Sequence, residues 1–298
     1  MTTRGQIRIG MAGWRYDEWR GSFYPEKLAQ RRELEYASRQ INSVELNGTF
    51  YSMQRPKSFA QWIKETPDDF VFSVKGGKFI THVRQLENVA TPLANFLAQG
   101  LLQLGKKMGP ILWQFPPAFK FNPKLLQDFF ALLPRTHKQA AGYARQRDEW
   151  MAERSWLDVT EDLPLRHAVE ARNKSFATPD YISLLRKNNI AAVVADTPKW
   201  PRMMDITADF VYCRLHGNEE QYPNGYDADG IESWARRVLA WSQGKEVTDG
   251  VRVHPDDAAK LPSRDVFVYF DDDVKVRAPH DAMSLTRRIA ELTETSQG

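Results

Sequence analysis

The 298-residue chain is 42% hydrophobic and carries a formal net charge of +3. This charge permits an anionic substrate but does not by itself indicate nucleic-acid binding, which is usually marked by clustered cations. The sequence has no apolar run of about 18 residues that would span a membrane and no apolar export signal near its start. Its single cysteine, Cys213, excludes an internal disulfide. We therefore expect a cytoplasmic protein that makes no membrane contact.

Apolar, β-branched segments alternate with helix-favouring segments along the chain. Strands are predicted at 7–10, 43–47, 70–75, 111–115, 167–172, 190–195, 209–217 and 265–270. Helices are predicted at 28–39, from 56 onward, and at 92–107, 123–133, 179–187, 230–242 and 279–292. Eight strands that alternate with helical segments predict an α/β fold in which residues 1–298 form a single (β/α)8 TIM-type barrel.

One segment interrupts this alternation. Residues 135–165, before the fifth predicted strand, are polar, helix-favouring and mixed in charge. We predict that they form a helical insertion on the surface of the barrel. The sequence shows neither a second domain boundary nor a close internal repeat.

The seventh predicted strand, 209–217, organises the predicted site. Side chains alternate between the two faces of a strand, so Arg214 and His216 lie on one face near its carboxyl end, about 6–7 Å apart. Burying a guanidinium in such an apolar strand without a partner would be costly. We therefore expect an anionic group close to Arg214.

Polar side chains also end most of the other predicted strands. Parallel strands of a barrel bring their carboxyl ends to one rim, where such barrels carry their sites, so these side chains are predicted to converge. The set comprises Glu45, Asn47, Lys75, Gln114, Glu170, Arg172, Asp196, Arg214, His216 and Asp271. The alternative is that glutamate and arginine merely neutralise each other at the barrel mouth.

Four of these residues are predicted to be catalytic. Glu45 and Glu170 fit a general acid and base, and His216 fits a proton carrier near neutral pH. Lys75 adds positive charge, and for this residue ion binding is favoured over a Schiff base.

The remaining candidates are predicted to bind substrate. Arg172 and Arg214 suit a phosphate or carboxylate, because a guanidinium donates two parallel hydrogen bonds. Rings just after the strands could stack on bases or sugars, or simply pack over the barrel end. The predicted substrate-binding set is Trp14, Asn47, Tyr51, His82, Gln114, Arg172, Asp196, Arg214, Tyr222, Tyr226 and Asp271.

The sequence identifies no cofactor. Its histidines and carboxylates include the ligand types of zinc and manganese sites, but no close spacing such as His-x-x-x-His is present. Lys75, Arg172 and Arg214 would also compete for the same carboxylates, so a divalent metal is not favoured. The phosphate-binding glycine motifs of nucleotide cofactor sites are absent from the sequence.

Several motifs together resemble the YecE-like family, a domain of unknown function. They are Gly-Met-Ala-Gly-Trp (10–14), Trp-Arg-Gly-Ser-Phe-Tyr-Pro (19–25), Val-Glu-Leu-Asn-Gly-Thr-Phe-Tyr (44–51), Phe-Ser-Val-Lys (72–75) with Thr-His (81–82), Gln-Phe-Pro-Pro (114–117), Val-Glu-Ala-Arg (169–172) and Arg-Leu-His-Gly (214–217). The resemblance covers nearly the whole chain and implies a TIM-type barrel without an established reaction. That barrel is similar to those of the endonuclease IV and sugar isomerase group, which suggests nucleic-acid or phosphosugar chemistry by fold analogy alone.

The chain departs from the family pattern at strand eight, where Asp271-Asp272 replaces the usual Asn-Asn. The added negative charge weakens phosphate binding there and favours a cation or a salt bridge. Our leading hypothesis is an enzyme acting on a phosphorylated or otherwise anionic substrate, with phosphodiester hydrolysis on nucleic acid as the predicted reaction. The alternatives are a non-catalytic binder of single-stranded nucleic acid or a small anion, and a sugar isomerase or lyase. The sequence leaves the oligomeric state open.

Overall fold

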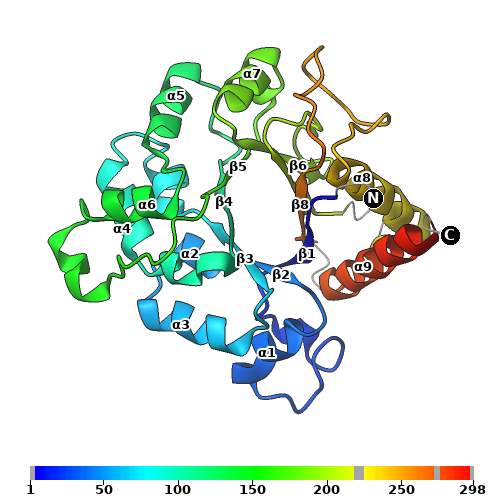
Figure 1. Cartoon of the computed structure of the whole chain (residues 1–298), viewed down its shortest axis with the longest axis horizontal. Helices are drawn as coiled ribbons and strands as arrows, with labels where there is room; N and C mark the ends of the chain where they lie inside the picture. The colour runs from blue at the N-terminus through cyan, green and yellow to red at the C-terminus, as the bar shows by residue number, and fades with distance from the viewer. Residues whose placement is uncertain (1–3, 218–224, 272–275, 296–298) are drawn as a thin grey trace.

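The computed structural model describes residues 4–217, 225–271 and 276–295 (Figure 1). Eight strands, each parallel to its neighbours, form a closed barrel in chain order, with the last strand paired to the first. The strands are β1 Ile7–Ala12, β2 Ser43–Leu46, β3 Val71–Lys75, β4 Met108–Gln114, β5 His167–Glu170, β6 Ala191–Asp196, β7 Phe210–Leu215 and β8 Asp265–Phe270. The predicted (β/α)8 barrel is therefore confirmed.

Helices surround this ring of strands (Figure 1). The α-helices are α1 Glu33–Ala37, α2 Gly48–Tyr51, α3 Pro56–Glu65, α4 Ala90–Ala98, α5 Pro123–Leu132, α6 His137–Ala144, α7 Pro179–Lys187, α8 Ala228–Ser242 and α9 Ala278–Thr295. Short 3-10 or π turns are η1 Asp17–Trp19, η2 Gln30–Arg32, η3 Phe79–Val83, η4 Leu101–Lys107, η5 Glu149–Arg154 and η6 Lys174–Phe176. Within the described residues, none of the helices is both long and apolar enough to cross a membrane.

The starts of several helices follow from local sequence. Proline occupies the first turn of α3, α5 and α7, where its missing N–H is not needed. The side chains of Asn122 and Asp227 accept hydrogen bonds from backbone N–H groups in the first turns of α5 and α8. These caps satisfy donors that a helix cannot satisfy internally.

Two predicted helices are shorter than expected. The segment 28–39 forms the 3-10 turn η2 followed by only five residues of α1. The segment 92–107 is divided between α4 and η4 at Gly100, whose φ of 116° is incompatible with a continuous α-helix. Glycine adopts this left-handed conformation at little steric cost, which explains the position of the break.

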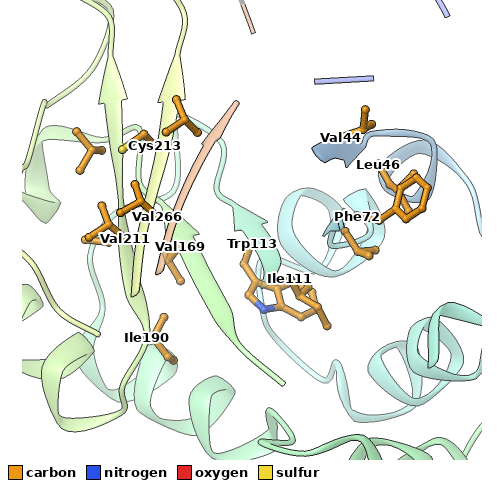
Figure 2. Close-up of a cluster of buried hydrophobic side chains, with 14 of the residues drawn as sticks. Val44, Leu46, Phe72, Ile111, Trp113, Val169, Ile190, Val211, Cys213 and Val266 are labelled. Carbon is orange, nitrogen blue, oxygen red and sulfur yellow. The ribbon is translucent and has the colours of Figure 1, made fainter. Parts of the chain in front are cut away.

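Alternation along the strands separates two apolar layers. One row, which includes Val44, Phe72, Ile111, Val169 and Cys213, faces the surrounding helices and belongs to the main hydrophobic core (Figure 2). The opposite row fills the barrel interior with Val71, Leu112, Ala168, Ala191, Val193, Phe210, Tyr212, Phe267 and Tyr269. One face of each strand thus packs against the surrounding helices, and the other face fills the centre of the barrel.

The segment 135–165 carries α6 and η5 and packs against α4, beside which α6 lies in Figure 1. Asn95 and Asp148 form two hydrogen bonds across this contact. The Asn95 side chain donates to the Asp148 carboxylate at 2.7 Å, and the Asp148 backbone N–H donates to Asn95 Oδ1 at 2.8 Å. Because Asn95 is buried, this pair fixes the position of the segment relative to the barrel.

We predict opposite effects for two glycine-to-alanine substitutions. A Cβ at Gly10 would lie 1.8 Å from the backbone oxygen of Ser43 on the neighbouring strand, whereas a Cβ at Gly142, in α6, meets open space. Gly10→Ala should lower the free energy of unfolding by about 3 kcal/mol or more. Gly142→Ala should raise it by about 0.5–1 kcal/mol. Urea unfolding measures both, and equal values for the two variants would contradict the packing described for β1.

Candidate active site at the barrel mouth

Strand alternation decides which polar residues reach the barrel mouth. Glu45, Lys75, Gln114, Glu170 and Arg214 continue the rows that fill the barrel interior, two residues closer to the carboxyl ends than Ser43, Ser73, Leu112, Ala168 and Tyr212. They therefore point inward and converge, although they are widely separated in sequence.

Arg214 lies at the centre of this group and is completely buried. Its Nε and Nη2 donate to the two oxygens of Glu45 at 3.1 and 2.9 Å. Its Nη1 donates to Glu170 at 2.6 Å, and its Nη2 also donates to Asp271 at 2.6 Å. The anionic partner expected for Arg214 is thus a set of three carboxylates.

The network extends downward into the barrel. The Tyr212 hydroxyl donates to Glu45 at 2.7 Å and lies 2.8 Å from the Ser73 hydroxyl, while Ser43 and Tyr269 form a similar pair at 2.7 Å. Burial, followed by the charge of Glu45, raises the pKa of Tyr212 well above its ordinary value. Tyr212 therefore remains a neutral hydrogen-bond donor to the Glu45 carboxylate.

We call the buried network around Arg214 the floor of the site. A cavity of about 550 Å³ lies above this floor, at the carboxyl ends of the strands. It is lined by Tyr16, Asn47, Phe50, Tyr51, Lys75, Lys78, His82, Gln114, Arg172, Trp200, His216 and Asp271. Glu45, Glu170 and Arg214 lie beneath the cavity and are not part of its lining. The predicted convergence is present, but two predicted catalytic carboxylates and one predicted anion-binding arginine are bound to each other under the site.

Lys75 projects into the cavity from the end of β3 and is only 7% exposed. Its Nζ lies 4.6 Å from the centre of the Phe50 ring, and within the described chain it forms no ion pair with a carboxylate. Burial, together with the charge of Arg214, lowers the pKa of Lys75 to about 8, despite the opposing effect of the nearby carboxylates. An amine with this pKa is partly neutral near physiological pH.

Two histidines also line the cavity. Nδ1 of His216 lies 3.6 Å from Asp271, and its buried Nε2 has no hydrogen-bond partner among the described residues. Burial and the charge of Arg214 lower the pKa of His216. His82 forms a 2.9 Å hydrogen bond with Thr81, and burial, with the charge of Lys75, lowers its pKa to about 4. Both imidazoles are therefore neutral at pH 7.

Arg172 borders the cavity between Glu170 and an aromatic ring. Its Nε donates to Glu170 at 2.5 Å, and its guanidinium stacks 4.1 Å from the centre of the Trp200 ring. Burial alone would raise the pKa of Glu170, but the charges of Arg214 and Arg172 hold it below its usual value. Both terminal nitrogens of Arg172 lack a protein partner within the described residues, so they can donate to a ligand.

Several predicted substrate-binding residues lie elsewhere. The side chain of Asp196 lies on the outer face of β6. Its carboxylate accepts hydrogen bonds from Arg202, Tyr226 and Trp234 at 3.0, 2.7 and 3.1 Å. Its partner Tyr226 packs its ring against Phe270 of β8 and does not line the mouth cavity. Trp14 lines a neighbouring cavity of about 650 Å³ that shares Tyr16 and Asn47 with the mouth. Tyr222 lies outside the described residues.

Sequence reasoning missed Tyr16 and Trp200 as parts of the site. Trp200 follows the end of β6 by four residues, so the rule that rings on loops after strands face the mouth would have found it. Asp196 is the polar residue at the end of β6, but Ala195 and not Asp196 lies on the inner face of that strand.

The described residues contain no group of three or more histidine, cysteine or acidic side chains arranged to hold a metal ion. The carboxylates at the barrel centre instead surround Arg214. The charged side chains lining the cavity are Lys75, Lys78, Arg172 and Asp271. Three cationic side chains and one carboxylate thus line the cavity, so its lining carries an excess of positive charge.

A closed parallel barrel with a chemically mixed cavity at its carboxyl ends defines a (β/α)8-barrel protein with its site in the usual place. The family model described as "Protein of unknown function DUF72" matches residues 8–297. The chain therefore belongs to the DUF72 family.

Relatives include "UPF0759 protein YecE" of Escherichia coli K12, which is 28% identical over 269 residues and aligns with 86% of this chain and 89% of its own length. "UPF0759 protein YunF" of Bacillus subtilis is 24% identical over 281 residues, which are 89% of this chain and 88% of the relative. A crystal structure of a DUF72 family protein from Thermotoga maritima matches 96% of this chain and 99% of its own, at a TM-score of 0.67 and 23% identity. The structural match supports the fold.

We predict that Arg214→Met strongly destabilises the protein. The substitution leaves the buried Glu45 and Glu170 and the partly buried Asp271 without their cation, which should lower the free energy of unfolding by about 3–5 kcal/mol at pH 7. Without Arg214 these carboxylates acquire raised folded-state pKa values, so the deficit should shrink as the pH falls toward the range where they protonate.

The matched control is Arg236→Met, which removes an exposed ion pair with Glu232 on α8 and should change stability little. Urea unfolding at pH 5 and pH 7 measures both variants. Equal stabilities for the two variants, or a deficit that grows on acidification, would show that Arg214 does not neutralise the cluster.

Proposed function

We propose that the chain is an enzyme whose mouth cavity binds a substrate carrying a phosphate or carboxylate group. The excess of lining cations supports this proposal, since the one lining carboxylate, Asp271, is already bound to Arg214. Side-chain amides of Asn47 and Gln114, and four aromatic rings, supply the polar and apolar contacts of a small-molecule site.

Arg172 is the proposed anion-binding side chain. Its guanidinium is fixed at Nε by Glu170 and on one face by Trp200, which leaves its terminal nitrogens to donate to two oxygens of one anion. A side chain held in place before binding loses little conformational entropy on binding. Lys78 adds charge at the edge of the same cavity. In this proposal Arg172 alone binds the anion, whereas the sequence predicted anion binding by both Arg172 and Arg214.

Lys75 is the proposed reacting group, and its burial in the cavity without a paired carboxylate carries the functional proposal. A partly neutral amine can accept a proton from substrate or attack a carbonyl carbon. His216 is the proposed second proton carrier, because its imidazole is neutral and its buried Nε2, 4.0 Å from Glu170, has no hydrogen-bond partner among the described residues. Glu45 and Glu170 are assigned a positioning role through Arg214.

Phosphodiester hydrolysis on nucleic acid is the specific reaction that we propose to test first. The observation that favours it is the presence of rings beside the cations: Tyr51 is 76% exposed at the rim, and Trp200 stacks on Arg172. Aromatic side chains next to phosphate-binding cations are typical of proteins that bind single strands. Lyase chemistry through Lys75 is the second reaction, favoured by its lowered pKa.

We predict that Lys75 reacts with amine reagents at a lower pH than an ordinary lysine. Since its pKa is about 8, its neutral fraction should rise through pH 8, whereas that of N-acetyl-lysine methylamide rises near about 10.4. Competitive acetylation with mass spectrometry of the Lys75 peptide measures the midpoint. A midpoint near that of the free amide would remove the proposed reacting group.

We predict turnover that depends on Lys75 and Arg172 in different ways. Single-stranded oligonucleotides, sugar phosphates and phosphorylated aldehydes should be incubated with the wild-type chain, with and without divalent cations, and products followed by phosphorus and proton NMR. Lys75→Met should reduce kcat at least about 100-fold, the lower range for loss of a general base or acid. Arg172→Met should mainly raise KM, because it removes binding of the anion in the ground state.

The controls separate an enzyme from a binder. Borohydride reduction traps a Schiff base on Lys75 and so distinguishes lyase chemistry from hydrolysis. Saturable binding of a phosphate ester without turnover of any compound would favour the non-catalytic alternative. Absence of both binding and turnover would contradict the proposed anion site itself.

A further inference from the structure

A second cavity, of about 680 Å³, adjoins the mouth cavity. The two share Phe50, Tyr51 and Lys78, so these three side chains border both cavities. Its volume falls in the range of ordinary ligand sites, about 300–1,000 Å³. We call it the side cavity. Neither the sequence motifs nor the proposed chemistry accounts for it.

Exposed rings are concentrated around the side cavity. Tyr51, Phe79 and Trp150 line it and are 76%, 50% and 54% exposed. Met53, also exposed, is part of the same wall, so four of the eight large apolar side chains exposed in the described residues line this one cavity. Apolar side chains that gather around a concave surface, rather than scatter singly, indicate a binding site.

One wall is supplied by the segment 135–165. Trp150 Nε1 donates to Asp148 at 3.3 Å, and Asp148 is in turn bound to the buried side chain of Asn95 on α4. The ring is therefore attached to the barrel through two successive polar contacts, although most of its surface is open. The segment 135–165 thus holds an aromatic side chain at the edge of the side cavity.

The opposite wall has an unusual backbone. The π-helical turn η3 carries Phe79 and is followed by Gln85, Leu86 and Asn88, whose φ angles are 45°, 71° and 52°. Isolated π turns are frequent at functional sites, and left-handed non-glycine residues are costly unless the surroundings fix them. Asn88 lines the side cavity, and Arg84 lies over the Phe79 ring at 5.3 Å.

We propose that the side cavity binds the base of a nucleotide whose phosphate lies in the mouth cavity. The exposed rings that line the cavity offer faces on which a planar base can stack, and Asn88, Thr91 and Arg84 offer hydrogen-bonding groups for its edges. Lys78, shared by both cavities, lies where the ring system and the anion meet. The inference rests on the proposed anion site and specifies its substrate class: a ring and a phosphate joined by a sugar, free or within a single strand.

The test compares ligands that contain the parts of a nucleotide. Binding of AMP, ribose 5-phosphate, adenosine and a five-residue oligodeoxyadenylate to the full chain is measured by calorimetry. AMP should bind at least about 5-fold more tightly than ribose 5-phosphate, and loss of one base–ring stack should cost about 5- to 150-fold. If the oligonucleotide binds more tightly than AMP, with a strong dependence on salt, the natural ligand is a single strand. If the two bind equally well, it is a free nucleotide.

Trp150→Ala and Phe79→Ala should each reduce AMP affinity toward that of ribose 5-phosphate, while leaving ribose 5-phosphate binding unchanged. The matched control is Trp156→Ala, which removes an exposed ring of the same insertion whose indole bonds to the Asp158 backbone and does not line the side cavity. Circular dichroism of each variant checks that it is folded.

Two failures are distinguishable. If ribose 5-phosphate binds in an Arg172-dependent manner but AMP binds no more tightly, or if Trp150→Ala behaves as Trp156→Ala does, the base subsite is wrong and the anion site stands. If adenosine binds in a Trp150-dependent manner but neither phosphate compound shows an Arg172 effect, the base subsite stands and the proposed anion site fails. Binding of none of the four compounds overturns both.

Discussion

The guanidinium of Arg214 joins the carboxylates of Glu45, Glu170 and Asp271, which come from three different strands or strand ends. Burial of these four groups carries a desolvation cost of several kcal/mol per ion, which is offset only while every hydrogen bond is made. Replacing such clusters with apolar side chains is often neutral or stabilising. Stability alone therefore does not explain this cluster, and its effect on the cavity above offers a better explanation.

Burial, more than the charges of the cluster, favours the neutral forms of the groups that face the cavity. It lowers the pKa of Lys75 and of His216, and the charge of Arg214 acts in the same direction, whereas Glu170 and Asp271 oppose that effect. The result is a neutral imidazole and a partly neutral amine beside Arg172. The cluster beneath the cavity thus adjusts a protonation state that is set first by burial.

Most of the fold, and the composition of the floor, could be predicted from the sequence. Eight apolar strands with polar ends specified the barrel, and the cost of burying Arg214 alone required anions close to it. The main error concerned which face of a strand a polar residue occupies. Asp196 ends β6 as the other polar residues end their strands, but its side chain lies on the outer face and points toward α8. The side cavity was not predictable, because it depends on where the insertion places Trp150 relative to η3, and local sequence patterns do not encode that contact.

The packing beneath Arg214 limits how molecules move through the site. Tyr212 and Tyr269, joined to the serines of neighbouring strands, and the apolar row below them occupy the barrel interior. A ligand in the mouth thus has no passage through the barrel axis in the described part of the chain, so it enters and leaves by the same opening. In the proposed enzyme, departure of the product would have to precede entry of the next reactant, and the exposed rings at the rim border that common route.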